Sequence, residues 1–295
     1  MYRRVKLRQR KGGGVDRRAA HRLHFPGAPR QNTHTYSQKA MVLSLVTAFH
    51  SGSADHQTDA RLRIGELDDL GKDMLEKAVA EIQGKLQRNP PILVFNKLCR
   101  QRRSVGFFAD PAKTFGYFYS KSCALSQAPG PAVQALLEYV NGHLGAEYNG
   151  VLVNKYEDGM DYISDHPDAE AGLDKSAGVA IITHGGERTM NFKVRKDAPP
   201  NSQRFASGAF KHEMKHQSIV VMSGQGFQRT FTHGIAQQKD RNQPRTSFTF
   251  RVHAGANEEK MTAAYHKSKA KIDELIERET DHATSEPTAK RAKSE

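Results

Sequence analysis

The sequence predicts a mainly β domain with α-helices in front of it, in the form of a β-sandwich or a barrel. After Gly145 the chain changes to short apolar or alternating runs separated by turn residues, a spacing typical of such folds. Before Gly145, two stretches place apolar residues at helical spacing. With 295 residues, 37% of them hydrophobic, the chain is long enough to bury a real core.

Two packing helices are expected ahead of the strands. The first covers residues 73–87 and ends at an Asn-Pro-Pro sequence, residues 89–91. The second begins at Gly130-Pro131, because proline suits the first position of a helix. Their apolar faces consist of Leu75, Ala78, Val79, Ile82 and Leu86, and of Val133, Leu136, Leu137, Val140 and Leu144.

The expected strands follow one another from residue 151 to residue 252. Six runs have the composition of strands: VLVNKY, VAIITHGG, MNFKV, SIVVMSG, QRTFTHG and RTSFTFRV. A charged, weakly amphipathic helix is expected over residues 258–280. We therefore expect a basic tail at 1–39, a domain at 40–253 with its strand-rich core at about 149–253, and a charged helical or disordered tail at 254–295.

The formal charge of +13 lies mostly in the first tail. Residues 1–39 hold eleven Lys and Arg and a single acid, Asp16, with almost no apolar periodicity, so we expect this segment to be disordered. A nucleic-acid-contacting arm or a solvated tail is favoured over an Arg-rich transit peptide. The basic residues 290–293 favour a nuclear location, with a mitochondrial one as the alternative.

Two classes of protein are excluded by composition. No run of about 18 apolar residues exists, and two cysteines, Cys99 and Cys123, are too few for a disulfide framework. We expect no membrane partner and a monomer.

One metal motif is misleading. Residues 212–216 read His-Glu-Met-Lys-His, the H-E-x-x-H pattern of zinc proteases, which needs both His on one face of a long helix. Here His216 runs directly into the strand-like SIVVMSG, and no third ligand follows at helical spacing. A polar turn entering a strand is the preferred interpretation.

A second set of residues indicates iron chemistry. His166 and Asp168 lie two apart, His233 ends a later strand, and two His with one carboxylate form the facial triad of Fe(II) oxygenases. That triad leaves three positions on the metal for a 2-oxo acid and O₂. Arg245 and Arg251 lie six residues apart on one face of an alternating strand and could bind the far carboxylate of the cosubstrate.

Over about residues 90–252 the sequence resembles the AlkB family of Fe(II)- and 2-oxoglutarate-dependent dealkylases. The matching stretches are VLVNKYEDG, ISDHPDAE, HQSIVVMSGQGFQRTFTHGI and PRTSFTFR. The resemblance implies a double-stranded β-helix, or jelly roll, with N-terminal helices outside it and a nucleotide-recognition lid. It assigns iron to His166, Asp168 and His233, and 2-oxoglutarate to Asn154, Tyr156, Arg245, Thr249 and Arg251. Ser247 stands where the family usually has Asn.

Residues 90–125 resemble the hairpin and lid of the branch that repairs duplex DNA. In that branch an aromatic wedge enters the base stack while a damaged base is flipped out. The resemblance assigns substrate or DNA contacts to Phe95, Asn96, Lys97, Arg103, Tyr117, Phe118, Tyr119 and Glu170. Phe95 would be the wedge, Tyr119 would stack on the flipped base against His166, and Lys97, Arg100, Arg102 and Arg103 would hold phosphates.

The expected function is therefore oxidative removal of N-alkyl groups from bases such as 1-methyladenine and 3-methylcytosine in DNA, with duplex DNA favoured and RNA as a further partner. Fe(II) would be the cofactor, and 2-oxoglutarate and O₂ the cosubstrates. Two alternatives stay open. The same iron chemistry could act on RNA or a protein, since the triad does not encode the substrate, or the chain could be a non-catalytic nucleic-acid binder with a relict oxygenase fold.

Overall fold

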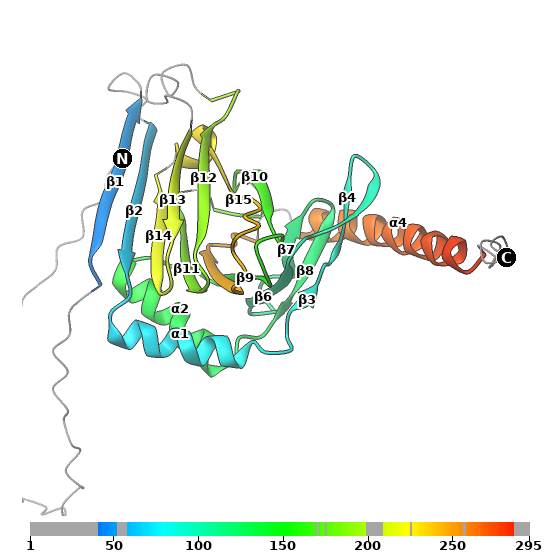
Figure 1. Ribbon diagram of the computed structural model, residues 1–295, viewed down its shortest axis with the longest axis horizontal. Helices are drawn as coiled ribbons and strands as arrows, with labels where there is room; N and C mark the ends of the chain where they lie inside the picture. Colours follow the sequence, from blue (N-terminus) through cyan, green and yellow to red (C-terminus); the bar gives the residue numbers. More distant parts are fainter. Residues whose placement is uncertain are drawn as a thin grey trace, which may run out of the picture. The chain divides into compact units, whose positions relative to one another are not determined.

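Two β-sheets face each other and form a double-stranded β-helix in this computed structural model (Figure 1). The structure describes residues 41–51, 58–168, 170, 172–174, 176–198, 209–224, 226–255 and 258–285. The basic tail expected at 1–39 and the basic residues 290–293 lie outside this part of the chain.

The larger sheet contains ten strands among the described residues, and it provides one wall of the fold. Its order is β1 (Leu43–Ser51), β2 (Thr58–Glu66), β14 (Ser218–Ser223), β11 (Val179–Gly185), β16 (Arg245–Arg251), β9 (Gly150–Tyr156), β6 (Ser104–Ala109), β8 (Ser122–Gln127) and β7 (Gly116–Tyr119), with β3 (Gln87–Arg88) paired to β6.

The smaller sheet provides the facing wall, and a separate two-stranded hairpin is part of neither sheet. The smaller sheet has the order β10 (Ile163–His166), β15 (Phe231–Ile235), β12 (Arg188–Val194) and β13 (Ala209–Met214). The hairpin consists of β4 (Pro91–Val94) and β5 (Lys97–Arg100).

Alternation along the central strands separates a helix-facing surface from a pocket-facing surface. On β16, Phe248 and Phe250 join the core under the helices, whereas the residues between and beside them line a pocket between the sheets. β9 follows the same rule, with Val151 and Val153 toward the helices. The pocket-facing residues of these two strands are Leu152, Asn154, Tyr156, Arg245, Ser247, Thr249 and Arg251.

Two helices cover the outer face of the larger sheet, as the sequence predicts. α2 (Pro131–Leu144) has proline at its start and ends at Gly145, which adopts a left-handed conformation with φ 60°. α1 (Asp69–Glu81) is capped by Asp68, whose side chain accepts a hydrogen bond from the Gly71 N–H. This helix ends at Glu81 rather than at residue 87, because the chain turns through Gly84, at φ 74°, into β3.

Several strands lie outside the six runs named from the sequence. β1 and β2 pair with each other and extend the larger sheet through β14. On β2 the buried Ala60 and Leu62 and the half-buried Ile64 alternate with more exposed residues, so a period-two signal was present. Within QRTFTHG the first residues belong to α3 (Phe227–Thr230), and only the rest forms β15.

The last described element is the helix α4 (Glu258–Ser285), which begins where the sequence predicts and continues past residue 280. It contacts β4, β5 and β8 and belongs to the same compact unit as the jelly roll. The expected boundary after residue 253 therefore does not separate a free tail up to Ser285. In the described part of the chain, no helix is long and apolar enough to cross a membrane.

Candidate active site

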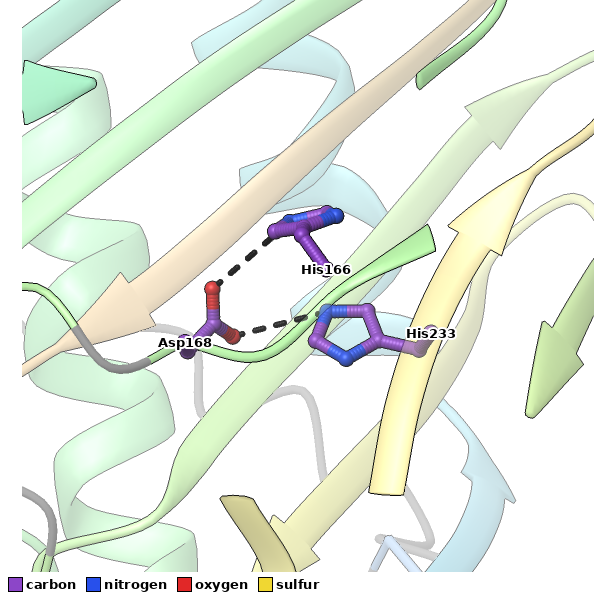
Figure 2. A group of neighbouring side chains, drawn as sticks. All are labelled: His166, Asp168 and His233. Carbon is purple, nitrogen blue, oxygen red and sulfur yellow. Dashed lines mark ion pairs between the residues drawn. The ribbon is translucent and has the colours of Figure 1, made fainter. Parts of the chain in front are cut away.

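Three side chains meet beside strands β10 and β15 of the smaller sheet (Figure 2). His166 ends β10, His233 lies in β15, and these two residues are paired partners in the ladder between the strands. Asp168 follows two residues after His166 and points at both rings. Its Oδ1 lies 3.9 Å from His166 Nε2 and its Oδ2 lies 3.5 Å from His233 Nε2. The three ligand atoms lie within 4.8 Å of one another.

Burial keeps both imidazoles neutral. It lowers the pKa of His233 to about 3 and also lowers the pKa of His166. His166 Nδ1 lies 2.9 Å from the Ser164 carbonyl oxygen, a contact in which only a protonated nitrogen can donate. This hydrogen bond leaves the Nε2 lone pair of His166 free to act as a ligand.

Asp168 is held as a carboxylate by a neighbouring cation. Burial acts to raise its pKa, but Arg251, His233 and His166 together outweigh that effect, and the pKa ends below its usual value. Arg251 Nη2 donates to Asp168 Oδ1 at 2.6 Å, and the Asp168 backbone N–H donates to Gln228 Oε1 at 2.8 Å. Oδ1, on the side of His166, is thus fixed by Arg251, and Oδ2 faces His233.

The residues present fit a divalent metal ion. Among the described residues, Asp168 Oδ2 and His233 Nδ1 are buried polar atoms without a hydrogen-bond partner. A buried carboxylate oxygen without a partner costs free energy unless a cation supplies one. Two neutral imidazoles and one carboxylate, a donor set suited to iron, form the one such group in the described part of the chain.

An arginine without a carboxylate partner lies deeper in the same pocket. Arg245 is 1% exposed, and burial lowers its pKa to about 10. Its Nη2 donates to Thr183 Oγ1 at 3.0 Å and its Cζ lies 5.4 Å from the centre of the Tyr156 ring, but its Nε has no partner among the described residues. A buried guanidinium in this state fits an anionic ligand such as the far carboxylate of 2-oxoglutarate.

The other residues assigned to 2-oxoglutarate lie around this arginine. Asn154, Tyr156 and Thr249 all line the pocket, which is also lined by His166 and His233. The Ser247 hydroxyl lies 3.5 Å from the Asn154 carbonyl oxygen, at the limit of a hydrogen bond. The structure thus brings the assigned cosubstrate residues together next to the triad.

The aromatic residues expected to form the lid do not all face the pocket. We call β7 and β8, residues 116–127, the lid. Tyr119 lines the pocket, with its ring edge-on to His166 at 6.1 Å. Tyr117 is buried, and its hydroxyl donates to Glu170 Oε1 at 2.8 Å. Phe118 instead stacks on Phe115 behind the lid, with ring centres 5.9 Å apart.

Glu170 is an acidic residue in a largely buried position, where a negative charge is unfavourable. Burial raises its pKa, and the negative charge of Asp168 raises it further. The carboxylate lines a small cavity behind Tyr117, between the lid and α4, rather than the triad pocket itself. Its expected contact with the substrate is not visible in this arrangement.

Phe95 is the most exposed large apolar side chain in the described structure, with 95% of its surface accessible. Together with Asn96 it forms the two-residue turn between β4 and β5, at φ 48° and 62°. Such turns favour Asn and Gly, and a bulky aromatic residue at positive φ is uncommon and strained. Neither burial nor turn geometry explains Phe95, so its side chain is available to a partner. It is not an ordinary core residue of a strand.

The expected phosphate contact of Arg103 is contradicted by the structure. Its side chain is 5% exposed, its Nε donates to Asn154 Oδ1 at 2.8 Å, and its Cζ lies 5.5 Å from the centre of the Tyr119 ring. Because β6 pairs with β9, residue 103 is carried into the pocket. Arg103 therefore positions pocket residues instead of facing a nucleic-acid backbone.

The remaining expected phosphate ligands are on the surface. Lys97 is exposed at the turn end of β5. Arg100 lies 3.6 Å from Glu279 of α4, and Arg102 lies 3.9 Å from Asp161. Both arginines are about half exposed, so neither is locked by its partner.

The H-E-x-x-H sequence does not form a metal site. His212 lies in strand β13, paired with Met190, and His216 lies in the turn that follows. The Gly185 N–H donates to His216 Nδ1 at 3.0 Å. Since a strand and a turn cannot place both His on one helix face, the zinc-protease interpretation is excluded.

Two residues that hold pocket side chains were missed by the sequence analysis. Thr183, which accepts from Arg245, lies on the same face of β11 as the pocket-lining Ile181, and the period of two could have pointed to it. Gln228, which holds the Asp168 backbone, comes from a stretch expected to be a strand, 60 residues away. No local signal in the sequence identifies that contact.

Similarity to curated proteins agrees with this site. The chain is 28% identical over 187 residues to the human "DNA oxidative demethylase ALKBH2", covering 63% of this chain and 68% of that protein. Its counterpart in Arabidopsis thaliana is 26% identical over 55% of this chain and 57% of that protein. Human "alpha-ketoglutarate-dependent dioxygenase alkB homolog 3" is 27% identical over 41% and 42%, respectively.

Two further comparisons add little. No protein-family model matches the chain. A solved structure of OsALKBH1 superposes with a TM-score of 0.40 at 14% sequence identity, over 65% of this chain and 96% of that chain, a similarity too low to bear on fold or function.

The two-sheet fold, the His-Asp-His triad and the deep arginine, with these relatives, define an Fe(II)- and 2-oxoglutarate-dependent dioxygenase. Its sequence is similar to members of the AlkB family of such enzymes, including the proteins named ALKBH2.

Proposed function

We propose that this protein removes N-alkyl groups oxidatively from damaged bases in DNA, most plausibly the methyl groups of 1-methyladenine and 3-methylcytosine, and that it prefers duplexes. The exposed Phe95 at the tip of a separate hairpin is the observation that carries the preference for duplexes. Two of the relatives described above are named as DNA oxidative demethylases, which supports DNA as the substrate.

The hairpin is connected to the pocket by a short path. The Leu93 N–H donates to the Ser120 carbonyl oxygen at 3.2 Å, and Ser120 follows Tyr119, whose ring lies against His166. Flipping a base out of a duplex costs a few kcal/mol, less when the base is already damaged. Phe95 can fill the vacated space and Tyr119 can stack on the flipped base, and each stacking contact is worth about 1–3 kcal/mol.

The pocket residues have separable tasks in this reaction. Fe(II) held by the triad, with 2-oxoglutarate and O₂, would supply the oxidation of the N-alkyl carbon, which leaves as an aldehyde. Arg245 binds the far carboxylate of the cosubstrate, and Asn154 and Tyr156 orient it beside Thr249. Arg251 keeps Asp168 ionised and fixed in direction, while burial keeps His166 and His233 free of protons.

RNA is a second candidate substrate, because the metal-binding triad does not determine which substrate is oxidised. The substrate test compares methylated duplex DNA, the same strand alone, and the RNA of the same sequence, each with Fe(II), 2-oxoglutarate and ascorbate. The repaired base is quantified by mass spectrometry. We expect turnover on all DNA arms, fastest on the duplex.

Three outcomes would contradict the proposal. Turnover confined to RNA would favour the second candidate. Turnover on none of the arms, with iron and 2-oxoglutarate still bound in a titration, would point to a different substrate such as a protein side chain. Binding of neither ligand would indicate a relict fold. The monomeric state, the nuclear location and a nucleic-acid-binding role for the first tail stay predictions.

A further inference from the structure

The hairpin that carries Phe95 is a strand pair of neither sheet, although β4 contacts β8 and the Leu93 N–H donates to the Ser120 carbonyl oxygen. We call residues 91–100 the wedge hairpin. It has only two strands of four residues each, and it is not part of the larger or the smaller sheet. Two-stranded hairpins of this size are at best marginally stable in water. Ile92 and Leu93 are nevertheless buried, so other parts of the chain must cover them.

The helix α4 supplies part of that cover. It contacts both strands of the wedge hairpin and strand β8 of the lid. Ile272 of α4 is 4% exposed, although most of the helix is polar. The covered positions recur every three or four residues along one stripe of the helix: Met261, Tyr265, Ser268, Ile272, Leu275 and Ile276.

The two ends of α4 hold different elements. At the first end, Phe115 at the base of the lid packs against the Tyr265 ring at 5.7 Å, and its backbone N–H donates to the Glu258 carboxylate. At the far end, Glu279 pairs with Arg100 at the base of the wedge hairpin. Figure 1 shows α4 extending past β8 and β4, in agreement with these contacts.

The same helix also borders the segment that follows the triad. Met261 lines the small cavity behind Tyr117 and lies against Gly172, four residues beyond Asp168. A single helix that follows the last strand of the jelly roll therefore contacts three parts around the pocket: the segment after Asp168, the lid and the wedge hairpin.

We propose that α4 is a positioning element that fixes the wedge hairpin relative to the pocket and thereby determines how well the enzyme acts on duplex substrates. This inference rests on the function proposed above. A single strand needs no wedge, because its bases are already unpaired. Weakening the α4 contact should therefore lower activity on duplexes more than on single strands.

The test uses the full chain and a matched pair of variants. Ile272→Asp places a charge on the covered stripe, and Ala270→Asp places the same charge on an exposed position of the same helix. We expect kcat/KM on the methylated duplex to fall about tenfold in Ile272→Asp, with the single strand within about twofold, and neither to change in Ala270→Asp. Equal losses on duplex and single strand, or an unchanged duplex rate, would overturn the proposal.

A second measurement reports on the hairpin without turnover. The chain has no tryptophan, so Phe95→Trp introduces a single fluorescent reporter at the tip. Its anisotropy should fall when Ile272→Asp or the milder Tyr265→Ala is added, while the melting temperature changes little. An unchanged anisotropy in both would also overturn the proposal. A wild-type protein inactive on both substrates would instead refute the proposed function, leaving the anisotropy result to decide whether α4 orders the hairpin.

Discussion

The pocket and the wedge hairpin are built on opposite principles. The pocket takes its side chains from strands at the centre of two sheets, where Asn154, Arg245 and His233 are nearly inaccessible to solvent. The wedge hairpin has two short strands of its own and an aromatic tip that is almost entirely exposed. The candidate metal ligands thus sit on rigid, shared elements, whereas the proposed DNA wedge sits on an attached element.

The largest expected effect is the loss of turnover in a variant that damages only the pocket. His166→Ala removes one of the three metal ligands while the hairpin keeps its structure. Losing even an outer partner of a metal ligand typically costs about 10–100-fold, so loss of a ligand should reduce turnover by more than about 100-fold. Formaldehyde release on a single strand and iron binding by titration measure this effect.

A histidine on another face supplies the control for this variant. His184 lies in strand β11, with its Nε2 3.1 Å from Glu76 Oε2 on α1, outside the triad. His184→Ala should keep its turnover and its iron stoichiometry. Full turnover by His166→Ala would show that the triad does not hold the metal.

A smaller effect on activity is expected from a variant that changes only the wedge hairpin. Phe95→Ala removes one stacking contact worth about 1–3 kcal/mol, which corresponds to a loss of about 5–150-fold in kcat/KM on a duplex. Single-strand activity should stay within about twofold, because the pocket is untouched. Steady-state rates on the two substrates measure the difference.

An exposed apolar residue of the lid makes a matched control. Leu125 is also exposed, in strand β8 of the lid. Leu125→Ala should not alter the ratio of duplex to single-strand activity. If Phe95→Ala lowers both activities equally, Phe95 is not a wedge.

The smallest expected effect concerns stability and is independent of the metal. His253 packs against Phe107 and Tyr117, and burial together with the charge of Arg251 lowers its pKa to about 3. Because the unfolded state binds a proton below pH 6.5 and the folded state does not, stability is lost as the pH falls from about 6.5 toward 3. The loss is about 1.4 kcal/mol for each pH unit.

The variant His253→Phe removes this proton-binding group and keeps a ring of similar size. The free energy of unfolding, measured by urea denaturation at pH 7 and pH 5.5, should change less with pH in the variant than in the wild type. His166 and His233 have shifts of the same sign, so the variant keeps part of the pH dependence. An unchanged dependence would mean that His253 is protonated in the folded protein.

The sequence indicated the fold and the triad because both leave local signals. Alternation along β16 placed Arg245 and Arg251 on one face, and both line the pocket. The places of Asn154, Tyr156 and the hairpin of Phe95 came from the resemblance to the AlkB family. Patterns of this kind can be recognised from residues that lie close together in the sequence.

The features that the sequence did not predict depend on contacts between residues far apart in the chain. Arg103 reads as a surface charge until β6 pairs with β9 and carries it against Asn154. The pair of Asp168 and Arg251 joins residues 83 positions apart. The helix α4 was expected as a charged, weakly amphipathic helix, but its packing on the lid was not, since only a sparse stripe of apolar residues marks the face that makes this contact.

The pairing of His166 with His233 across two neighbouring strands has a further consequence. Backbone hydrogen bonds of the sheet, rather than the ion, set the distance between the two imidazoles. Iron could then dissociate and return without any refolding, in contrast to small domains whose ligands come together only when metal binds. Two imidazoles and a carboxylate also suit several divalent ions, so metal availability would help decide which one fills the site.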